Sequence, residues 1–313
     1  MAKKIKKSKK KRVKKTMHKI VHSKHKIKHS IKHKIKRAVK HHKKMHKMHV
    51  KDARHKKHGG HGRQRRAGRR LINLVPRKKK KLIRVPLGIP NFDKLIQGGF
   101  EKNTTNLLVG GSGSGKTIFA AQFLVSGMKK GEKCLYVTFE EKKEQFYENM
   151  KEFGWDLEEY EKKGLFTFLE YTPIQVKTML EEGGGSIESI ILKKKIDRMV
   201  FDSITSFALL FEDELSKREA ALALFGLIRG WNCTALLTLE EEPLARDKAT
   251  SSALEFESDS IIILYFVRQR GERERYVEVM KMRGTKHSEK VYAFEIGKGG
   301  IIIKRPVSKF IPG

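Results

Sequence analysis

Residues 104–117 read TTNLLVGGSGSGKT, and residues 110–117 within this stretch fit the phosphate-binding pattern G-x-x-x-x-G-K-[ST] at every fixed position. The preceding TTNLLVG is a short apolar run typical of a strand. The following IFAAQFLVSGMKK, residues 118–130, has apolar residues at helical spacing. A strand, a glycine loop and a helix in this order predict a phosphate-binding loop rather than a glycine-rich hairpin with an incidental lysine.

The residue types of this loop suit a nucleoside triphosphate with Mg²⁺. Glycines let successive backbone N–H groups point inward, and the start of the next helix adds unpaired N–H groups and the positive end of its dipole. Lys116 is expected to reach the β- and γ-phosphates, and the Thr117 hydroxyl to ligate Mg²⁺. The predicted ATP-binding residues are Gly110, Gly111, Ser112, Gly113, Ser114, Gly115, Lys116 and Thr117.

The charge of the chain is concentrated at its amino-terminal end. Residues 1–84 hold 37 Lys and Arg and one acid, whereas residues 85–313 hold 33 Lys and Arg and 34 Asp and Glu. Twelve of the 13 histidines also lie in the first segment. We therefore predict two parts, a basic arm over 1–84 and a globular domain over 85–313. With few apolar residues, the arm is predicted to be disordered alone, although a helix-like apolar stripe lets it fold on a polyanion.

Four interpretations of the arm remain open. Nucleic-acid binding through phosphate contacts is the first, because clustered Lys and Arg give sequence-independent affinity. An anionic membrane surface is less favoured. Metal binding by the histidines lacks a defined ligand spacing, and a solvated tail is the plainest alternative.

The remaining composition indicates a cytoplasmic protein. The longest apolar run, residues 261–267, is far too short for a membrane helix, and no apolar core follows the basic start as in a secretory signal. Cys134 and Cys233 each open an apolar run, which is typical of buried reduced thiols.

From residue 85 the chain alternates strand-type and helix-type segments. Strands are expected at 133–141, 164–171, 198–202 and 233–240, with helices at 141–154, 186–196 and 214–230. Three last strands, at 260–267, 274–284 and 290–303, follow without helices. This pattern predicts an α/β fold with a mostly parallel central sheet, helices on both faces and antiparallel carboxyl-terminal strands. Ligands bind beyond the carboxyl ends of such strands.

Acidic residues end two of these strands. Asp202 closes RMVFD and suits a second contact to Mg²⁺, against the alternative of a turn cap. Glu140 and Glu141 follow YVTF, and one of them is expected to orient and deprotonate the attacking water. The sequence leaves open which of the two faces the phosphate, and also whether both are solvated acids that start a helix.

Residues 281–287 read KMRGTKH after a predicted strand. Lys281 and Arg283 lie two residues apart, so they share one face of a strand and suit charge stabilisation of a leaving phosphate. A basic loop on a hairpin is the alternative.

Together these residues resemble the KaiC-type branch of the RecA-like P-loop ATPases. The resemblance runs from PLGIPNFDKLIQGGF at 86–100, through GGSGSGKT, the Glu140–Glu141 pair and Asp202, to KMRGTKH and FEIGKGGIII at 294–303. It implies a single KaiC-like domain of archaeal or bacterial type, acting as a hexameric or similar ring with ATP held between subunits. Lys281 and Arg283 would then reach the ATP of the neighbouring subunit. The basic arm is no part of the family pattern.

The leading functional hypothesis is a cytoplasmic, ring-forming, Mg²⁺-dependent ATPase of slow turnover, with a regulatory role and an arm that tethers it to nucleic acid. One alternative is an ATP-gated assembly switch with little turnover. Another is a recombinase-like DNA repair ATPase, although the acidic start of the predicted polar linker 241–256 argues against strand exchange. The chain has one nucleotide loop, where the clock protein of the family has two domains, so a circadian oscillator is not expected.

Overall fold

A computed structural model of the chain describes residues 82–208, 211, 213–241, 250–269, 271–308 and 310. The predicted arm lies outside the described residues except for its last three positions. Of these, Arg84 is part of the fold: β1 (Arg84–Val85) pairs with β2 (Phe100–Glu101), and the Arg84 guanidinium donates to the Thr285 hydroxyl at 2.7 Å. No helix among these residues is long and apolar enough to cross a bilayer.

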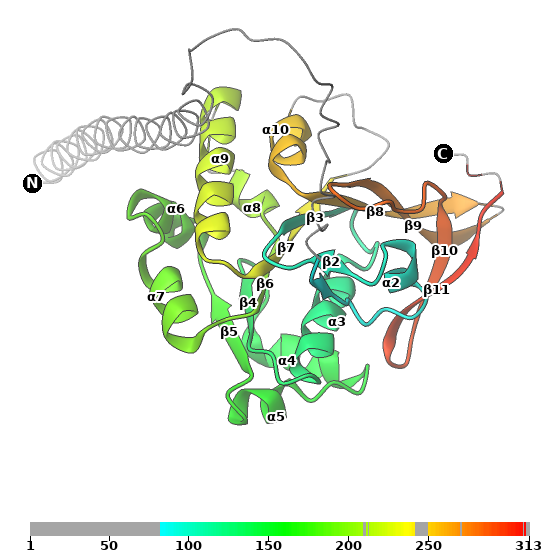
Figure 1. The fold of residues 1–313 in the computed structure, drawn as a ribbon, viewed down its shortest axis with the longest axis horizontal. Helices are drawn as coiled ribbons and strands as arrows, with labels where there is room; N and C mark the ends of the chain where they lie inside the picture. The colour runs from blue at the N-terminus through cyan, green and yellow to red at the C-terminus, as the bar shows by residue number, and fades with distance from the viewer. Residues whose placement is uncertain are drawn as a thin grey trace, which may run out of the picture. The chain divides into compact units, whose positions relative to one another are not determined.

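A nine-stranded sheet is the centre of the described part (Figure 1). Six strands are parallel: β3 (Thr105–Gly110), β4 (Cys134–Thr138), β5 (Phe166–Glu170), β6 (Arg198–Asp202), β7 (Thr234–Glu240) and β8 (Ser260–Gln269). Three more continue the sheet in antiparallel fashion: β9 (Glu272–Met282), β10 (Tyr292–Gly297) and β11 (Gly300–Pro306). The spatial order is β11-β10-β9-β8-β3-β7-β6-β4-β5. The predicted α/β fold, with a mostly parallel sheet and antiparallel carboxyl-terminal strands, is confirmed.

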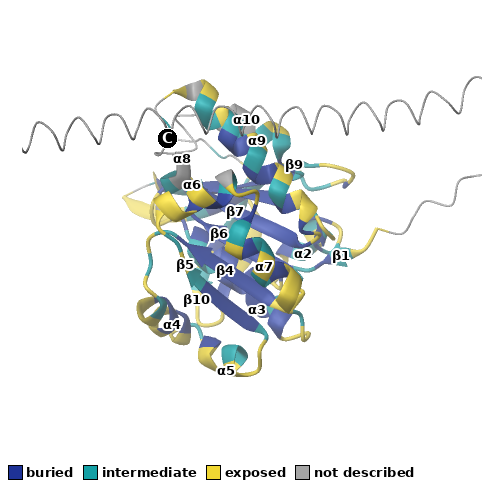
Figure 2. Ribbon diagram, turned by 90° about the vertical axis from the view of Figure 1, so that its left-hand side faces the viewer, coloured by how far each residue is buried: buried dark blue, intermediate teal, exposed yellow. Residues whose placement is uncertain are grey.

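Helices cover both faces of this sheet. One face carries α3 (Lys116–Met128), α4 (Lys143–Lys151) and α5 (Leu157–Lys162). The other carries α6 (Pro173–Glu181), α7 (Gly185–Lys194) and α9 (Glu214–Gly230). Three further helices are α2 (Phe92–Leu95), α8 (Thr205–Ala208) and α10 (Thr250–Glu257). In Figure 2 the parallel strands β4, β6 and β7 in the middle of the sheet are buried, while the outer faces of helices such as α4 and α7 are exposed.

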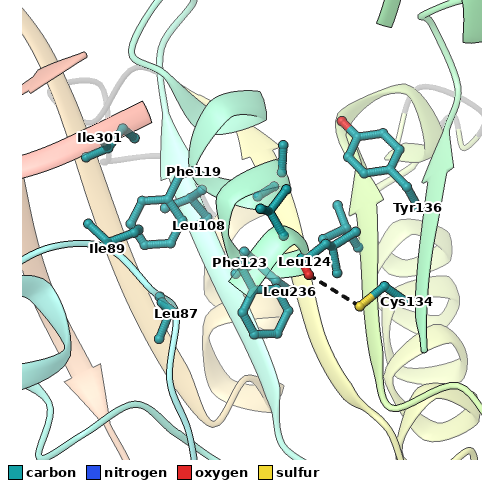
Figure 3. Close-up of a cluster of buried hydrophobic side chains, with 14 of the residues drawn as sticks. Leu87, Ile89, Leu108, Phe119, Phe123, Leu124, Cys134, Tyr136, Leu236 and Ile301 are labelled. Atoms are coloured by element: carbon teal, nitrogen blue, oxygen red, sulfur yellow. Dashed lines mark hydrogen bonds between the residues drawn. The ribbon is translucent and has the colours of Figure 1, made fainter. Parts of the chain in front are cut away.

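The side-chain alternation of the strands builds the two cores. Leu108 of β3 packs with Phe119 and Phe123 of α3, whereas Leu107 and Val109 pack in the second core with α9. Figure 3 shows the first core, in which Cys134 of β4 donates its thiol hydrogen to the Leu124 carbonyl at 3.4 Å. β3 is central and buried on both faces, and the glycine loop follows its carboxyl end.

A buried arginine fastens the segment before the loop to the sheet. Arg198, at the start of β6, is 0% exposed and donates to the Glu132 carboxylate at 2.5 and 3.1 Å. It also donates to the carbonyls of Pro86 at 2.7 Å and Phe123 at 2.8 Å. The Phe123 ring lies 4.9 Å from its guanidinium carbon. One side chain therefore joins β6, α3 and the chain that leads to β3.

The structure differs from the expected elements in several places, and the helices α5 and α6 are not among those expected from the sequence. The single strand predicted over 290–303 is a hairpin of β10 and β11, turned by Gly299 and Gly300 with φ of 96° and 100°. The polar linker predicted over 241–256 contains α10 in its second half. The helix predicted over 141–154 is shorter, because β4 ends at Thr138 and α4 begins only at Lys143.

Candidate active site

The glycine loop joins the end of β3 to the start of α3 and leaves little space for side chains at three of its glycines. A Cβ at Gly110 would lie 2.5 Å from Ser114 Oγ, and one at Gly113 would lie 3.3 Å from the Phe266 ring. Gly115 has φ of 99° and would place a Cβ 3.0 Å from Ile296 Cδ1. Backbone atoms therefore form this part of the loop, as the binding of a phosphate by backbone N–H groups requires.

The start of α3 fits an anionic ligand. Gly115 is its N-cap residue, and no described side chain forms a capping hydrogen bond there. Lys116 is buried beside it, and its ammonium donates to the carbonyls of Gly110 and Gly111, each at 2.9 Å. The Glu240 carboxylate lies 3.6 Å from the same nitrogen. The unfilled helix N–H groups and this lysine form a positive site at the carboxyl edge of the sheet.

Asp202 lies beside the loop at the end of β6 and accepts three hydroxyl hydrogen bonds. The Thr117 hydroxyl donates at 2.7 Å and that of Tyr136 at 2.5 Å, both to Oδ2, whereas Thr238 donates to Oδ1 at 2.5 Å. The structure thus brings the two predicted Mg²⁺ ligands together. Hydroxyl and carboxylate oxygens are the hard ligands that Mg²⁺ prefers, so these residues fit the ion.

Two of the residues that donate hydrogen bonds to Asp202 are not apparent from the sequence. Tyr136 comes from β4 and Thr238 from β7, the strands on either side of β6. Burial, followed by the nearby charge of Asp202, raises the pKa of Tyr136 well above its ordinary value of 10.0. The tyrosine hydroxyl therefore stays protonated and remains a donor to the carboxylate.

Glu140 and Glu141 follow β4 in a turn, so the strand alternation expected for them does not apply. Their backbone N–H groups both donate to Thr138 Oγ1, at 3.3 and 3.1 Å. The exposed Glu140 side chain accepts from the Ser206 hydroxyl. Glu141 is partly buried and accepts from Asn149 Nδ2 at 3.0 Å. Burial first, and then the charge of Asp202, raises the pKa of Glu141, although the Asn149 hydrogen bond opposes this.

Lys281 and Arg283 lie away from the loop of the same chain. Met282, between them, pairs with Ser260, which pairs with Asn106 near the start of β3, whereas the loop follows the end of this strand. Lys281 donates to the carbonyls at 255 and 258, at 2.6 and 2.8 Å. Arg283 donates to the carbonyl at 256 at 2.6 Å. The pair therefore binds the carboxyl end of α10, at the opposite edge of the sheet.

Comparisons with known proteins show the family of the chain. The family model described as "ATPase: KaiC" matches residues 85–308. The circadian clock protein KaiC3 of Synechocystis is 33% identical over 224 residues, which cover 69% of this chain and 44% of the relative. The chain thus spans less than half of that relative. A UPF0273 protein of Pyrococcus horikoshii is 34% identical over 233 residues, which cover 70% of this chain and 93% of the relative.

A solved structure is also similar. The crystal structure of a KaiC-like protein from the hyperthermophilic Pyrococcus horikoshii OT3 aligns with a TM-score of 0.64 at 38% identity, and covers 72% of this chain and 100% of that one. The family match extends over most of the described part, from the segment before β3 to β11. The chain belongs to the KaiC family of ATPases and contains a KaiC-like domain with a RecA-like fold.

Proposed function

We propose that this domain binds ATP with Mg²⁺ at the loop 110–117 and hydrolyses it slowly to ADP and phosphate. The observation that carries the proposal is the 2.7 Å contact between the Thr117 hydroxyl and the Asp202 carboxylate, next to the buried Lys116. Bound Mg²⁺ supplies positive charge that neutralises phosphate oxygens. Thr117 and Asp202 would hold it, while Lys116 exchanges its bonds to Gly110 and Gly111 for phosphate oxygens.

Within this mechanism, Glu141 rather than Glu140 is the base that accepts a proton from the attacking water. Glu141 is partly buried on the side of Asp202 and has a raised pKa, so it accepts a proton more readily than a solvated glutamate. Glu140 is exposed and bonded to Ser206. The backbone N–H groups of the loop and of α3 would bind and orient the phosphates.

Lys116→Ala tests this site in the full chain. It is expected to abolish binding of a fluorescent ATP analogue and Mg²⁺-dependent phosphate release, because no other described ammonium lies over the loop carbonyls. Lys129→Ala is a matched control on the same helix, at its exposed carboxyl end. Analogue binding that is unchanged in Lys116→Ala would show that the loop is not the nucleotide site.

The same proposal includes a ring of subunits, hexameric or similar, with ATP between neighbours. It is supported by the position of Lys281 and Arg283, which lie at the opposite edge of the sheet from the loop and so suit the phosphates of another copy better than those of their own. Cations directed at a leaving phosphate stabilise the charge that develops on it.

Arg283→Ala tests the contribution between subunits. Turnover is expected to fall by two orders of magnitude or more, roughly the effect of removing an arginine finger, while ATP binding remains. Phosphate release and analogue titration on the same sample separate these effects. Full turnover in Arg283→Ala would contradict the role in a neighbouring site.

An ATP-gated assembly switch with little turnover is the second candidate. The separation of the two cations from the loop favours it, because ATP between copies would join them whether or not it is hydrolysed. Ring formation measured by light scattering in ATP and in ADP, beside single-turnover hydrolysis, decides between them. Assembly that needs ATP, with negligible turnover, would favour the switch.

We also propose that the arm tethers the domain to nucleic acid in the cytoplasm. This is supported by the 37 Lys and Arg of residues 1–84 and by two buried free cysteines in the domain. Binding of DNA and RNA by the full chain and by residues 82–313 across a salt series tests it. A steep fall with salt, in the full chain only, is expected. Equal binding by the truncated chain would contradict the tether.

A further inference from the structure

The loop has a second cationic contact, which the proposed mechanism does not use. Arg275 lies on β9 and donates through Nε and Nη2 to the carbonyl oxygen of Gly113, at 3.3 and 3.1 Å. Both bonds come from one guanidinium and end on one backbone oxygen of the loop. Gly113 and Arg275 are 162 residues apart in the chain, so the antiparallel extension of the sheet creates this contact.

An aromatic ring supports the guanidinium. Phe266 of β8 is paired directly with Arg275 of β9, so their side chains lie on the same face of the sheet. The Arg275 guanidinium carbon lies 4.1 Å from the centre of the Phe266 ring. The same ring is so close to the loop that a Cβ at Gly113 would approach it to 3.3 Å. Loop backbone, ring and guanidinium therefore form one packed unit.

A neighbouring arginine provides an internal comparison. Arg273 lies two residues earlier on β9 and stacks on the same ring, with its guanidinium carbon 5.1 Å from the ring centre. Arg273 is exposed, whereas Arg275 is partly buried, and of these two arginines only Arg275 donates to the loop among the described contacts. The two residues thus share charge and platform but differ in the bond to Gly113.

We propose that Arg275 is a positioning residue of the phosphate loop, which holds the Gly113 carbonyl against the Phe266 platform and so keeps the loop in the shape that receives ATP. This rests on the proposed ATP site. A planar guanidinium can place two N–H groups on one oxygen and stack on a ring at the same time, which an ammonium cannot do. A carbonyl held in this way is also kept from turning its negative end toward the phosphates.

Loss of the Arg275 contact is expected to change the affinity for ATP more than the rate of hydrolysis. The contact between Arg275 and the Gly113 carbonyl holds the loop both before and after the reaction. Its loss should therefore raise the KM and the Kd for ATP and leave kcat nearly unchanged. For Arg275→Gln we expect a rise of roughly tenfold in Kd, the order of one charge-assisted hydrogen bond. Hydrogen exchange at the amide of Ser114, in the same peptide unit as the Gly113 carbonyl, should become faster.

The experiment compares four variants of the full chain by titration with a fluorescent ATP analogue and by steady-state kinetics. Arg275→Gln and Phe266→Leu should weaken binding, and Arg275→Lys should recover only part of it. Arg273→Gln, which removes the same charge from the same ring, should change the Kd by less than about twofold. If Arg275→Gln does not fold, as judged by its melting temperature, the comparison of Arg275→Lys with Arg273→Gln decides.

The result that overturns the proposal is equal affinity in the Arg275 and Arg273 variants, whether both weaken binding or neither does. A loss confined to kcat would overturn it as well. Lys116→Ala distinguishes this failure from failure of the proposed function. If Lys116→Ala abolishes analogue binding and the Arg275 variants do not weaken it, the proposed ATP site stands and only the positioning role of Arg275 is wrong.

Discussion

Glu140 and Glu141 are adjacent in the chain but have different surroundings. Glu141 is partly buried and bonded to Asn149, whereas Glu140 is exposed and bonded to Ser206. We expect Glu141→Gln to reduce kcat by at least a hundredfold, the order of a lost general base, and Glu140→Gln to reduce it by less than about tenfold. Phosphate release at saturating ATP measures both. The reverse ranking would assign the base to Glu140.

The pH dependence of turnover follows from the same environment. A base must be deprotonated to act, and the pKa of Glu141 is raised above its ordinary value of 4.5. The rate should therefore begin to fall, on acidification, at a higher pH than for a solvated glutamate. Asn149 donates the hydrogen bond that lowers this pKa, so Asn149→Ala should move the acid limb of kcat further upward. Movement to lower pH would contradict this assignment.

Tyr136 positions Asp202 in the proposed Mg²⁺ site, because its hydroxyl donates a hydrogen bond of 2.5 Å to the carboxylate. Tyr136→Phe keeps the ring but leaves a buried carboxylate oxygen with one donor fewer. We expect the Mg²⁺ concentration for half-maximal activity to rise by roughly three- to tenfold. Tyr147→Phe, which loses a hydroxyl bond to Glu161 outside the site, is the control. An equal shift in both variants would exclude a specific role.

Candidate site residues that belong to a local sequence pattern can be picked out from the sequence. Residues whose contacts come from distant parts of the chain cannot. Lys116, Thr117 and Asp202 stand at loop and strand ends that can be recognised from a few adjacent residues, and the structure brings them together. Tyr136 and Arg275 look like ordinary strand residues. Their roles depend on partners 66 and 162 positions away in the chain, which only the strand order identifies.

Among the elements, the alternation of strands and helices was predictable and three details were not. Helix α6 has a recognisable start, in which Thr172 and Gln175 form a capping box and Pro173 occupies the first turn, but its apolar stripe is short. The hairpin of β10 and β11 was expected as one strand because both halves are apolar, although the glycines at 297, 299 and 300 are themselves a turn signal. In α10, packing against α9 stabilises a segment whose composition is typical of a linker.

Strand β6 depends on Arg198, whose bonds to Glu132, Pro86 and Phe123 join three elements. Arg198→Met leaves the Glu132 carboxylate and two carbonyls without this donor, and should lower the free energy of unfolding by about 3–5 kcal/mol. Urea denaturation of the full chain, followed by tryptophan fluorescence, measures it. Lys163→Met, which breaks the exposed pair with Glu159, should cost far less than this, because solvent screens such a pair. Equal costs would show that Arg198 does not join the elements.

For the whole molecule, the two halves of the proposed site can be inactivated separately. Lys116→Ala destroys the loop of a subunit and Arg283→Ala destroys the cation that it would offer to a neighbour. Each variant alone should be inactive. In an equal mixture that exchanges subunits, about one quarter of the interfaces should combine an intact loop with an intact arginine. Recovery of about one quarter of the activity, measured against mixing time, is expected, and none would contradict sites shared between copies.

The opposite placement of the loop and of Lys281 and Arg283 on one sheet also gives each subunit a direction. An open row of such subunits always has one unused loop at one end and one unused cation pair at the other. In the proposed ring, only closure lets every copy work, so the specific activity should increase with protein concentration and level off once the rings are complete. The placement of the two halves of the site at opposite ends of one sheet would thus make the specific activity a measure of how many subunits are in closed rings.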